Sequence, residues 1–204
     1  MHIVAFEYLT ADQRAQCARI LREAFSHIPA YEDEGDAEAE VETFLTVPER
    51  FALAALDGEI VLGLIGGIDT YSHAAELHPL AVDPVHQGKG VGSALTAALE
   101  ARVAAMGKLT VYLGTDDEVG GTSLFGADLF PGALAKLATI KPTTGHPFFF
   151  YRRLGYEPVG ILPDANGRGK PDLLMAKRVG PPSQASATGT AATSASPSPP
   201  PRTR

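Results

Sequence analysis

The stretch from Glu76 to Ser93 holds the residues whose types and order are suited to chemistry. It begins as an apolar strand, ELHPLAV, is interrupted at Asp83-Pro84, and passes through three glycines into a long helical pattern, SALTAALEARVAAM. A strand that leads through a glycine-rich turn into a helix N-terminus aligns several backbone N–H groups at the positive end of the helix dipole, where they can bind a phosphate. The stretch therefore predicts a phosphate site.

The glycine turn does not fit two common nucleotide-binding motifs. Its sequence, QGKGVG at 87–92, lacks the G-x-x-x-x-G-K-[ST] spacing of a Walker A loop, because Lys89 is followed by Gly90. It is not a dinucleotide fingerprint either, since that motif follows the first strand of a βαβ unit, whereas two or more predicted strands precede this turn. What remains is a pyrophosphate site without a Mg²⁺ ligand, suited to a carrier such as coenzyme A. The alternative is a tight turn that uses glycines for structure alone.

Three further side chains are candidates for the chemistry. Glu76 is an acid on an otherwise apolar strand, which favours a functional role. The same strand contains His78, which could equally be structural, and Pro79, which cannot donate a ladder hydrogen bond and so predicts a bulge or an opening of the sheet. Tyr151, in HPFFFYRRLGY, could act on a substrate or belong to the core. No group of cysteine, histidine and acidic residues has metal-site spacing, so we predict no metal.

The elements that must position these residues predict an α/β fold. Asp57-Gly58 is a turn dipeptide between two β-rich runs and predicts an antiparallel hairpin. The order of strand, glycine turn, helix and strand predicts a right-handed crossover between two parallel strands. The loop at 114–132 has a length that usually carries function. The expected helices cover 10–25, a segment ending near Pro48, 90–105, 133–139 and 147–154, and the expected strands cover 2–9, 51–57, 60–68, 76–82, 108–113 and two runs within 156–179.

Composition and charge limit the class of protein and of partner. The chain of 204 residues is 45% apolar, enough for one sizeable core, and its formal net charge is −7. Nucleic acid is therefore disfavoured as a partner, and a cationic small molecule or a basic peptide is favoured. The single cysteine, Cys17, excludes an internal disulfide and favours a cytoplasmic location, and we predict no signal peptide and no membrane segment. We expect one domain over residues 1–179 and a disordered tail rich in Pro, Ser, Ala and Thr over 180–204.

Several motifs together carry a resemblance to a known superfamily. QGKGVG after an interrupted apolar strand, with FYRRLGY near the end, resembles the GNAT acetyltransferases, which use acetyl-CoA. The longer strings ELHPLAV, YLGTDDE followed by GTSL, HPFFFYRRLGY and VGILPDANGRGKPDLLMAK resemble the aminoglycoside 6′-N-acetyltransferases, in the same order and at similar spacing over roughly residues 50–178. The resemblance implies a mixed, strongly twisted sheet with helices on both faces, and a homodimer.

The resemblance also implies roles for particular residues. Glu76 and Tyr151 are the implied catalytic residues: Glu76 would orient the acceptor amine and take its proton, and Tyr151 would protonate or position the departing thiolate. Backbone N–H groups near His78 and Leu80 would stabilise the oxyanion. The implied substrate-binding acids are Glu76, Asp116, Asp117 and Asp172. The implied coenzyme A-binding residues are Leu80, Ala81 and Val82 for the pantetheine arm, and Gln87, Gly88, Lys89, Gly90, Val91, Gly92 and Ser93 for the pyrophosphate.

The implied reaction is direct transfer of the acetyl group of acetyl-CoA to the 6′-amine of an aminoglycoside antibiotic in a ternary complex, which confers resistance. The chain departs from these relatives at Ala75, where many have tryptophan, and at Val119, where some have an acid, so we expect a partly rebuilt acceptor pocket. Two alternatives stay open. One is an acetyltransferase of the same fold that acts on a polyamine or a protein amine; the other is a non-catalytic acyl-CoA-binding sensor, which would not require Glu76 and Tyr151.

Overall fold

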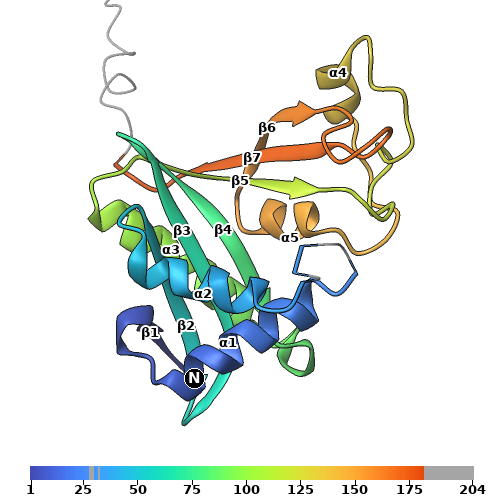
Figure 1. The fold of residues 1–204 in the computed structure, drawn as a ribbon. Helices are drawn as coiled ribbons and strands as arrows, with labels where there is room; N and C mark the ends of the chain where they lie inside the picture. The colour runs from blue at the N-terminus through green and yellow to red at the C-terminus, as the bar shows by residue number, and fades with distance from the viewer. Residues whose placement is uncertain (28–29, 32, 182–204) are drawn as a thin grey trace, which may run out of the picture.

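A seven-stranded mixed sheet with helices on both faces is the frame of the molecule (Figure 1). The computed structural model describes residues 1–27, 30–31 and 33–181. The strands are β1 (His2–Ala5), β2 (Arg50–Asp57), β3 (Ile60–Tyr71), β4 (Ala74–Val82), β5 (Thr110–Asp116), β6 (Glu157–Leu162) and β7 (Asp172–Arg178), in the order β1-β2-β3-β4-β5-β7-β6 across the sheet. The helices are α1 (Ala11–Ala24), α2 (Asp36–Thr46), α3 (Val91–Ala105), α4 (Ala133–Leu137) and α5 (Pro147–Arg153). The predicted α/β class is confirmed.

The strands expected at 60–68 and 76–82 are a few residues longer in the structure, and two other predicted strands differ more. The first strand ends at Ala5 instead of Leu9, because the chain turns through a single 3₁₀ turn that buries the Phe6 ring completely. The strand expected at 108–113 begins and ends later, because β5 pairs with β7 as far as Asp116. Most of the predicted disordered tail lies outside the described residues. No helix of the described part combines the length and the apolar character that crossing a bilayer needs.

The central hairpin of β2 and β3 forms as the Asp57-Gly58 dipeptide predicted. Gly58 has a φ of +60°, which favours glycine, and the two strands pair in antiparallel register. Every side chain from Phe51 to Leu56 is buried, as is every residue from 61 to 67. Both faces of these strands are covered, which explains why the sequence shows continuous apolar runs instead of an alternation.

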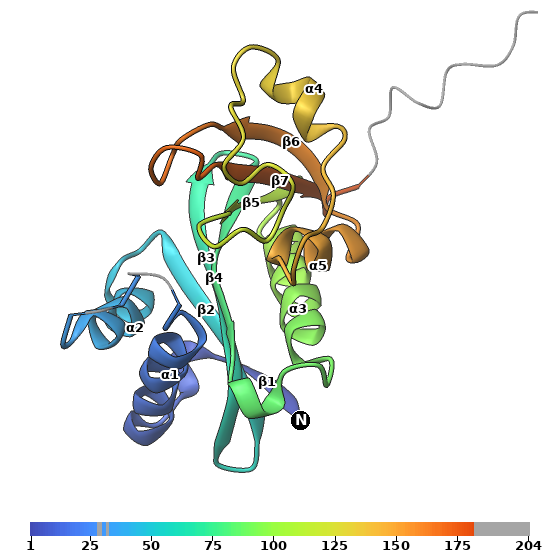
Figure 2. The same cartoon turned by 90° about the vertical axis from the view of Figure 1, so that its right-hand side faces the viewer.

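The two faces of the sheet carry two separate hydrophobic clusters, one under each helical layer (Figure 2). Helices α1 and α2 cover one face, where Phe6 and Phe44 meet edge to face at 5.2 Å. A capping box between Thr10 and Gln13 fixes the start of α1. Helices α3 and α5 cover the other face, which includes the fully buried Leu95 and Leu99 of α3.

A fork between β4 and β5 is the main irregularity of the sheet. The two strands pair in parallel only from Ala74 to Glu76 on β4, with Glu76 opposite Tyr112 as the last pair, and then diverge (Figure 1). On its other side, β4 remains paired with β3, but the register shifts where His78 and Pro79 together oppose Gly66. The predicted bulge at Pro79 is confirmed, and the predicted parallel pair is confirmed over its first three residues.

Gly66 sits at the bulge because no side chain fits there. A Cβ at this position would lie 2.3 Å from the His78 carbonyl oxygen and 2.7 Å from the Phe44 ring. The first of these atoms belongs to the backbone and cannot move aside easily.

We therefore expect Gly66→Ala to destabilise the fold by about 3 kcal/mol, the upper end of overpacking costs. For a chain of this size this corresponds to a Tm lowered by about 6–12 °C. Gly145→Ala is the matched control, because a Cβ there meets nothing within 4 Å, and it should leave the Tm almost unchanged. Thermal unfolding of the three proteins is the measurement, and equal Tm values would contradict the expectation.

Candidate functional site

The glycine turn at the end of β4 presents unused hydrogen-bond donors. Gly88 and Gly90 have φ values of +71° and +84°, a region that favours glycine, and Gly90 caps the N-terminus of α3. Within the described residues, none of the backbone N–H groups from Gly88 to Ser93 donates a hydrogen bond to the protein. These donors lie at the positive end of the α3 dipole, and Lys89 beside them is exposed. The turn has the electrostatics of an anion site.

Asp83 connects this turn to the rest of the fold, a role that the sequence did not reveal. Its side chain is only 7% exposed, accepts a bond of 3.0 Å from the Val85 N–H, and forms an ion pair of 2.8 Å with Arg19 of α1. Burial alone raises the pKa of Asp83, but the bonds from Arg19 and Val85 outweigh it and bring the pKa below its ordinary range. The Gln87 amide also donates to the Val82 carbonyl at 3.2 Å.

Beyond Glu76, no strand among the described residues pairs with the edge of β4 that faces the fork. Leu80, Ala81 and Val82 pair with β3 on one side, and the pairing with β5 has ended by this point. An extended strand points alternate backbone N–H and C=O groups to each side, so this edge has unused main-chain groups that an extended ligand could pair with. The edge leads directly into the glycine turn.

Glu76 lies at the vertex of the fork, where it contacts β5. Its Oε2 atom accepts a hydrogen bond of 3.0 Å from the Tyr112 hydroxyl, and the same hydroxyl lies 3.0 Å from Thr70 Oγ1. His78 is exposed, and its Nε2 atom lies 4.0 Å from a carboxylate oxygen of Glu40 on α2. The two predicted residues therefore have different neighbours, Glu76 on β5 and His78 on α2.

Asp116 and Asp172 oppose each other across β5 and β7, close to Glu76. The Asp172 carboxylate lies above Gly114, where a Cβ would be 2.8 Å from Asp172 Oδ2, and Asp172 Oδ1 is buried without a hydrogen-bond partner among the residues that the structure describes. Burial and then the Asp116 carboxylate raise the pKa of Asp172 to about 6, and Glu76 adds to the shift. Asp116 accepts a bond from the Asn166 amide. The three acids face one region but do not form a cluster able to ligate a metal within the described residues.

The prediction that Asp117 binds the acceptor is wrong. Its side chain is fully buried, and its two oxygens accept bonds from the N–H groups of Gly120, Gly121 and Thr122 and from the Thr122 hydroxyl, at 2.6–3.0 Å. With four donors around it, the carboxylate has no capacity left for a substrate ammonium. Asp117 instead folds the start of the long loop.

Tyr151 of α5 is 6% exposed and packs edge to face on Phe150 and Tyr156, at 5.1 and 5.5 Å. Burial raises the pKa of Tyr151 far above its ordinary value. The phenol is therefore protonated at neutral pH and can donate a hydrogen bond, although the raised pKa makes it a weaker acid. Its predicted contact with a thioester sulfur stays a prediction.

The two departures noted in the sequence lie in different environments. Ala75 is fully buried and points to the opposite face of β4 from Glu76, since successive side chains of a strand alternate. Alanine in place of a tryptophan at this position therefore changes the packing of the core, and it leaves the face on which Glu76 lies unchanged. Val119 is 60% exposed in the loop after β5.

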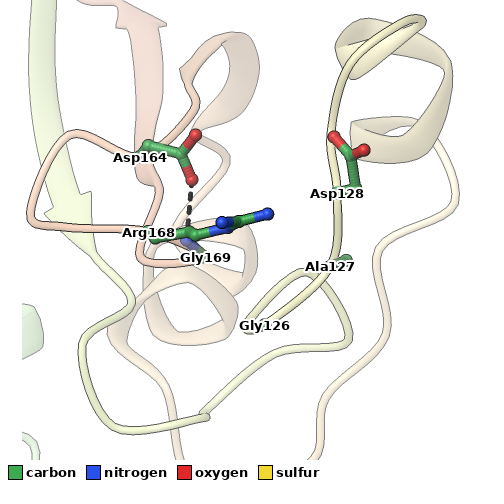
Figure 3. Close-up of a pocket in the computed structure, with 6 residues that line it drawn as sticks. All are labelled: Gly126, Ala127, Asp128, Asp164, Arg168 and Gly169. Carbon is green, nitrogen blue, oxygen red and sulfur yellow. Dashed lines mark hydrogen bonds between the residues drawn. The ribbon is translucent and has the colours of Figure 1, made fainter.

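A cavity of about 640 Å³ lies between two loops and is lined by none of the predicted site residues (Figure 3). Its walls are Gly126, Ala127 and Asp128 on one side and Asp164, Arg168 and Gly169 on the other, with the Arg168 side chain directed into the gap. The Gly126 N–H donates to the Gly169 carbonyl at 2.8 Å and so connects the two loops. Within the second loop, the Gly169 N–H donates to Asp164 at 2.6 Å.

Comparison with known proteins assigns the family. Residues 14–121 match the acetyltransferase (GNAT) family, so the chain belongs to the GNAT acetyltransferases. A curated relative, Acetyltransferase plu1384 of Photorhabdus laumondii subsp. laumondii, is 34% identical over 86 residues, or 41% of this chain and 59% of that protein. The chain thus spans about three fifths of the length of the curated relatives that it matches.

Solved structures give a longer match. An aminoglycoside 6′-N-acetyltransferase in complex with coenzyme A is 39% identical with a TM-score of 0.83, and the aminoglycoside 6′-N-acetyltransferase from Enterococcus faecium is 39% identical with a TM-score of 0.81. Each alignment covers 90% of this chain and 100% of the other. The ribosomal-protein-S18-alanine N-acetyltransferase from Escherichia coli, 16% identical with a TM-score of 0.55, shares the fold.

The raised pKa of Asp172 makes stability depend on pH. Because its folded-state pKa of about 6 lies above the unfolded value near 3.9, stability is lost as the pH rises through this window. We expect Asp172→Asn to raise the Tm at pH 8 by about 2–4 °C, about 1 kcal/mol after allowance for solvent screening. The gain should disappear at pH 4.

Thermal unfolding at both pH values, without substrate, measures this effect. Glu157→Gln is the control, since Glu157 is exposed and its side chain has no hydrogen-bond partner in the described part of the chain. A Tm gain for Asp172→Asn that is equal at pH 4 and pH 8 would argue against an ionisation effect.

Proposed function

We propose that this protein transfers the acetyl group of acetyl-CoA to the 6′-amine of an aminoglycoside in a ternary complex, and thereby confers resistance. The main support is the fork itself, where an unpaired strand edge leads from a row of carboxylates at Glu76 to a donor-rich glycine turn. The similarity to two solved aminoglycoside 6′-N-acetyltransferases over 90% of this chain supports the same assignment.

On the donor side, acetyl-CoA lies along β4 and ends at the glycine turn. The main chain of Leu80 to Val82 pairs with the pantetheine arm as an added strand would. The N–H groups from Gly88 to Ser93 bind the pyrophosphate, and the α3 dipole contributes to its charge stabilisation. The site needs no metal ion for this, because the backbone donors and the dipole supply the positive potential.

On the acceptor side, the row of Glu76, Asp116 and Asp172 binds the ammonium groups of the antibiotic. A cation that approaches Asp172 offsets the repulsion from its neighbours and favours its ionised form. Its buried Oδ1 atom then gains the partner that it lacks in the free protein. The same charges would also bind other polyamines. The acids therefore select for cationic amines in general and do not select one particular amine.

The chemical step is an addition followed by an elimination. Glu76 takes a proton from the acceptor ammonium, directly or through water, because only the neutral amine has a lone pair for attack. The nitrogen adds to the thioester carbonyl, and backbone N–H groups near His78 and Leu80 stabilise the oxyanion. The carbon–sulfur bond then breaks, and the phenol of Tyr151 protonates the departing thiolate or positions it by a hydrogen bond. The nitrogen loses its second proton in the same step, which balances the proton that the thiolate takes up. The products are an amide and coenzyme A.

The protein acts as a homodimer in the cytoplasm in this proposal. The edge strand β6 and its neighbour β7 expose apolar side chains that a second copy could cover: Val159 is 62%, Leu162 57% and Leu174 36% exposed. A chain whose one cysteine, Cys17, is buried is suited to a reducing compartment.

Two other functions remain testable against this one. The first is acetylation of a polyamine or a protein amine, which the acidic row would also bind. The second is a non-catalytic acyl-CoA sensor, which would use the glycine turn but not Glu76 and Tyr151.

An acceptor panel distinguishes the three functions. Thiol release from acetyl-CoA should be clearly above background with kanamycin or tobramycin and lower with spermidine or a basic peptide, and product mass should increase by one acetyl group. Preference for spermidine or the peptide would favour the first alternative. Coenzyme A binding without turnover of any amine would favour the sensor.

Glu76→Gln should lower kcat/KM for the acceptor by about 100-fold or more, the usual contribution of a general base. The dissociation constant of coenzyme A should stay the same, because the turn is separate from the vertex of the fork. Glu42→Gln, an exposed acid of α2, is the control and should retain full activity. Loss of coenzyme A affinity in Glu76→Gln would oppose the assigned role.

Asp83→Asn should weaken coenzyme A binding by about tenfold, because it loses a charged hydrogen bond that fixes the turn. The matched control is Glu23→Gln, which removes the other, more exposed partner of Arg19 and should leave the affinity unchanged. Calorimetric titration with coenzyme A is the measurement. Equal affinities of the two variants would refute the role of Asp83.

A further inference from the structure

Tyr112 occupies the one position on β5 that touches the vertex of the fork. It is the residue opposite Glu76 in the last pair before β4 and β5 diverge, and its hydroxyl lies 3.0 Å from Glu76 Oε2. In the described part of the chain this hydroxyl is the only donor to the Glu76 side chain. One carboxylate oxygen of Glu76 is therefore engaged, and the other is available to an amine.

The Tyr112 hydroxyl has a second hydrogen-bond partner, the hydroxyl of Thr70. It lies 3.0 Å from the hydroxyl of Thr70, near the end of β3, and has only one proton to donate. If that proton points to the charged carboxylate, the stronger acceptor, the Thr70 hydroxyl must donate to the phenol oxygen. Three adjacent strands thus supply one hydrogen-bonded chain, in which Thr70 and Tyr112 are the donors and Glu76 is the final acceptor.

The Tyr112 phenol is suited to donate a hydrogen bond to Glu76 at all times, because it stays protonated. Burial raises the pKa of Tyr112, the Thr70 bond opposes the shift, and the neighbouring Glu76 carboxylate adds to it, with a net rise. The ring also packs on Tyr71, with 5.9 Å between ring centroids at 60°. The hydroxyl and the ring are therefore both fixed, the first by Thr70 and the second by Tyr71.

We propose that Tyr112 is a positioning residue for the acetyl transfer: it holds Glu76 in the orientation that receives the proton of the acceptor amine. A glutamate side chain has three rotatable bonds, so a free carboxylate would occupy several rotamers and face the amine only part of the time. The bond to Tyr112 removes that freedom at the vertex. This inference rests on the proposed role of Glu76.

A purely structural role for Tyr112 makes a different prediction. If the tyrosine only packs on Tyr71, removal of its hydroxyl should leave kcat/KM unchanged. If the removal disturbs the structure in some other way, the loss in kcat/KM should be the same with Glu76 and with Gln at that position. If it acts through Glu76, its contribution should disappear once Glu76 is replaced, because residues that act as a unit are strongly non-additive.

The test is a double-mutant cycle with Tyr112→Phe and Glu76→Gln, using the amine that the wild-type enzyme acetylates best. We expect Tyr112→Phe to lower kcat/KM for the acceptor about tenfold, the effect of one hydrogen bond to a charged group, with the KM for acetyl-CoA unchanged. In the Glu76→Gln background the same change should cost less than about twofold. Tyr71→Phe, which keeps the ring contact, is the control and should match the wild type.

Variants of Thr70 supply a second readout that leaves Tyr112 intact. Thr70→Val removes the hydroxyl at constant shape and should lower kcat/KM in the same direction as Tyr112→Phe, whereas Thr70→Ser should rescue the loss. A tenfold loss in both backgrounds, or no loss in either, would overturn the inference and leave the proposed function intact. A wild-type protein that acetylates no amine of the panel would overturn both.

Discussion

The loss of pairing between two neighbouring strands is the constraint on which this molecule depends. β5 pairs with β7 along its whole length and β4 pairs with β3, whereas β4 and β5 pair with each other only from Ala74 to Glu76. The bulge at His78-Pro79 adds local bend and twist to β4 on the side where the strands part. The rest of the candidate site follows from this separation, because it frees a strand edge, ends it at a glycine turn and leaves one acid at the vertex.

A free edge inside a sheet is costly unless something fills it. Backbone N–H and C=O groups without a neighbouring strand form hydrogen bonds with water instead. A ligand that has amide groups can replace this water at a small cost in free energy. The pantetheine arm of coenzyme A has such amides, which is the physical reason for assigning it to this edge. At the end of the edge, Asp83 ties the turn to α1 on the opposite face of the sheet, so both helical layers support the donor site.

The sequence predicted features that depend on local chemistry and missed those that depend on register. The bulge at Pro79 follows from a missing N–H group, and the glycine turn follows from backbone angles that only glycine adopts readily. The contact of Tyr112 with Glu76 joins residues 36 apart, and that of Arg19 with Asp83 joins residues 64 apart, so neither could be read before the strands and helices were placed. Asp117 was misassigned for the same reason: the resemblance implied a contact with the acceptor, whereas the folded loop closes over its carboxylate.

Gly114 determines where a neighbouring carboxylate lies, although it has no side chain of its own. It lies between Tyr112 and Asp116 on the face of β5 that bears the acids, and the Asp172 carboxylate rests in the space that a methyl group would fill. The spacing of negative charge along the strand is therefore set by an absent side chain. A single added methyl would move the Asp172 carboxylate without altering the net charge, so the spacing of the acids depends on an uncharged residue.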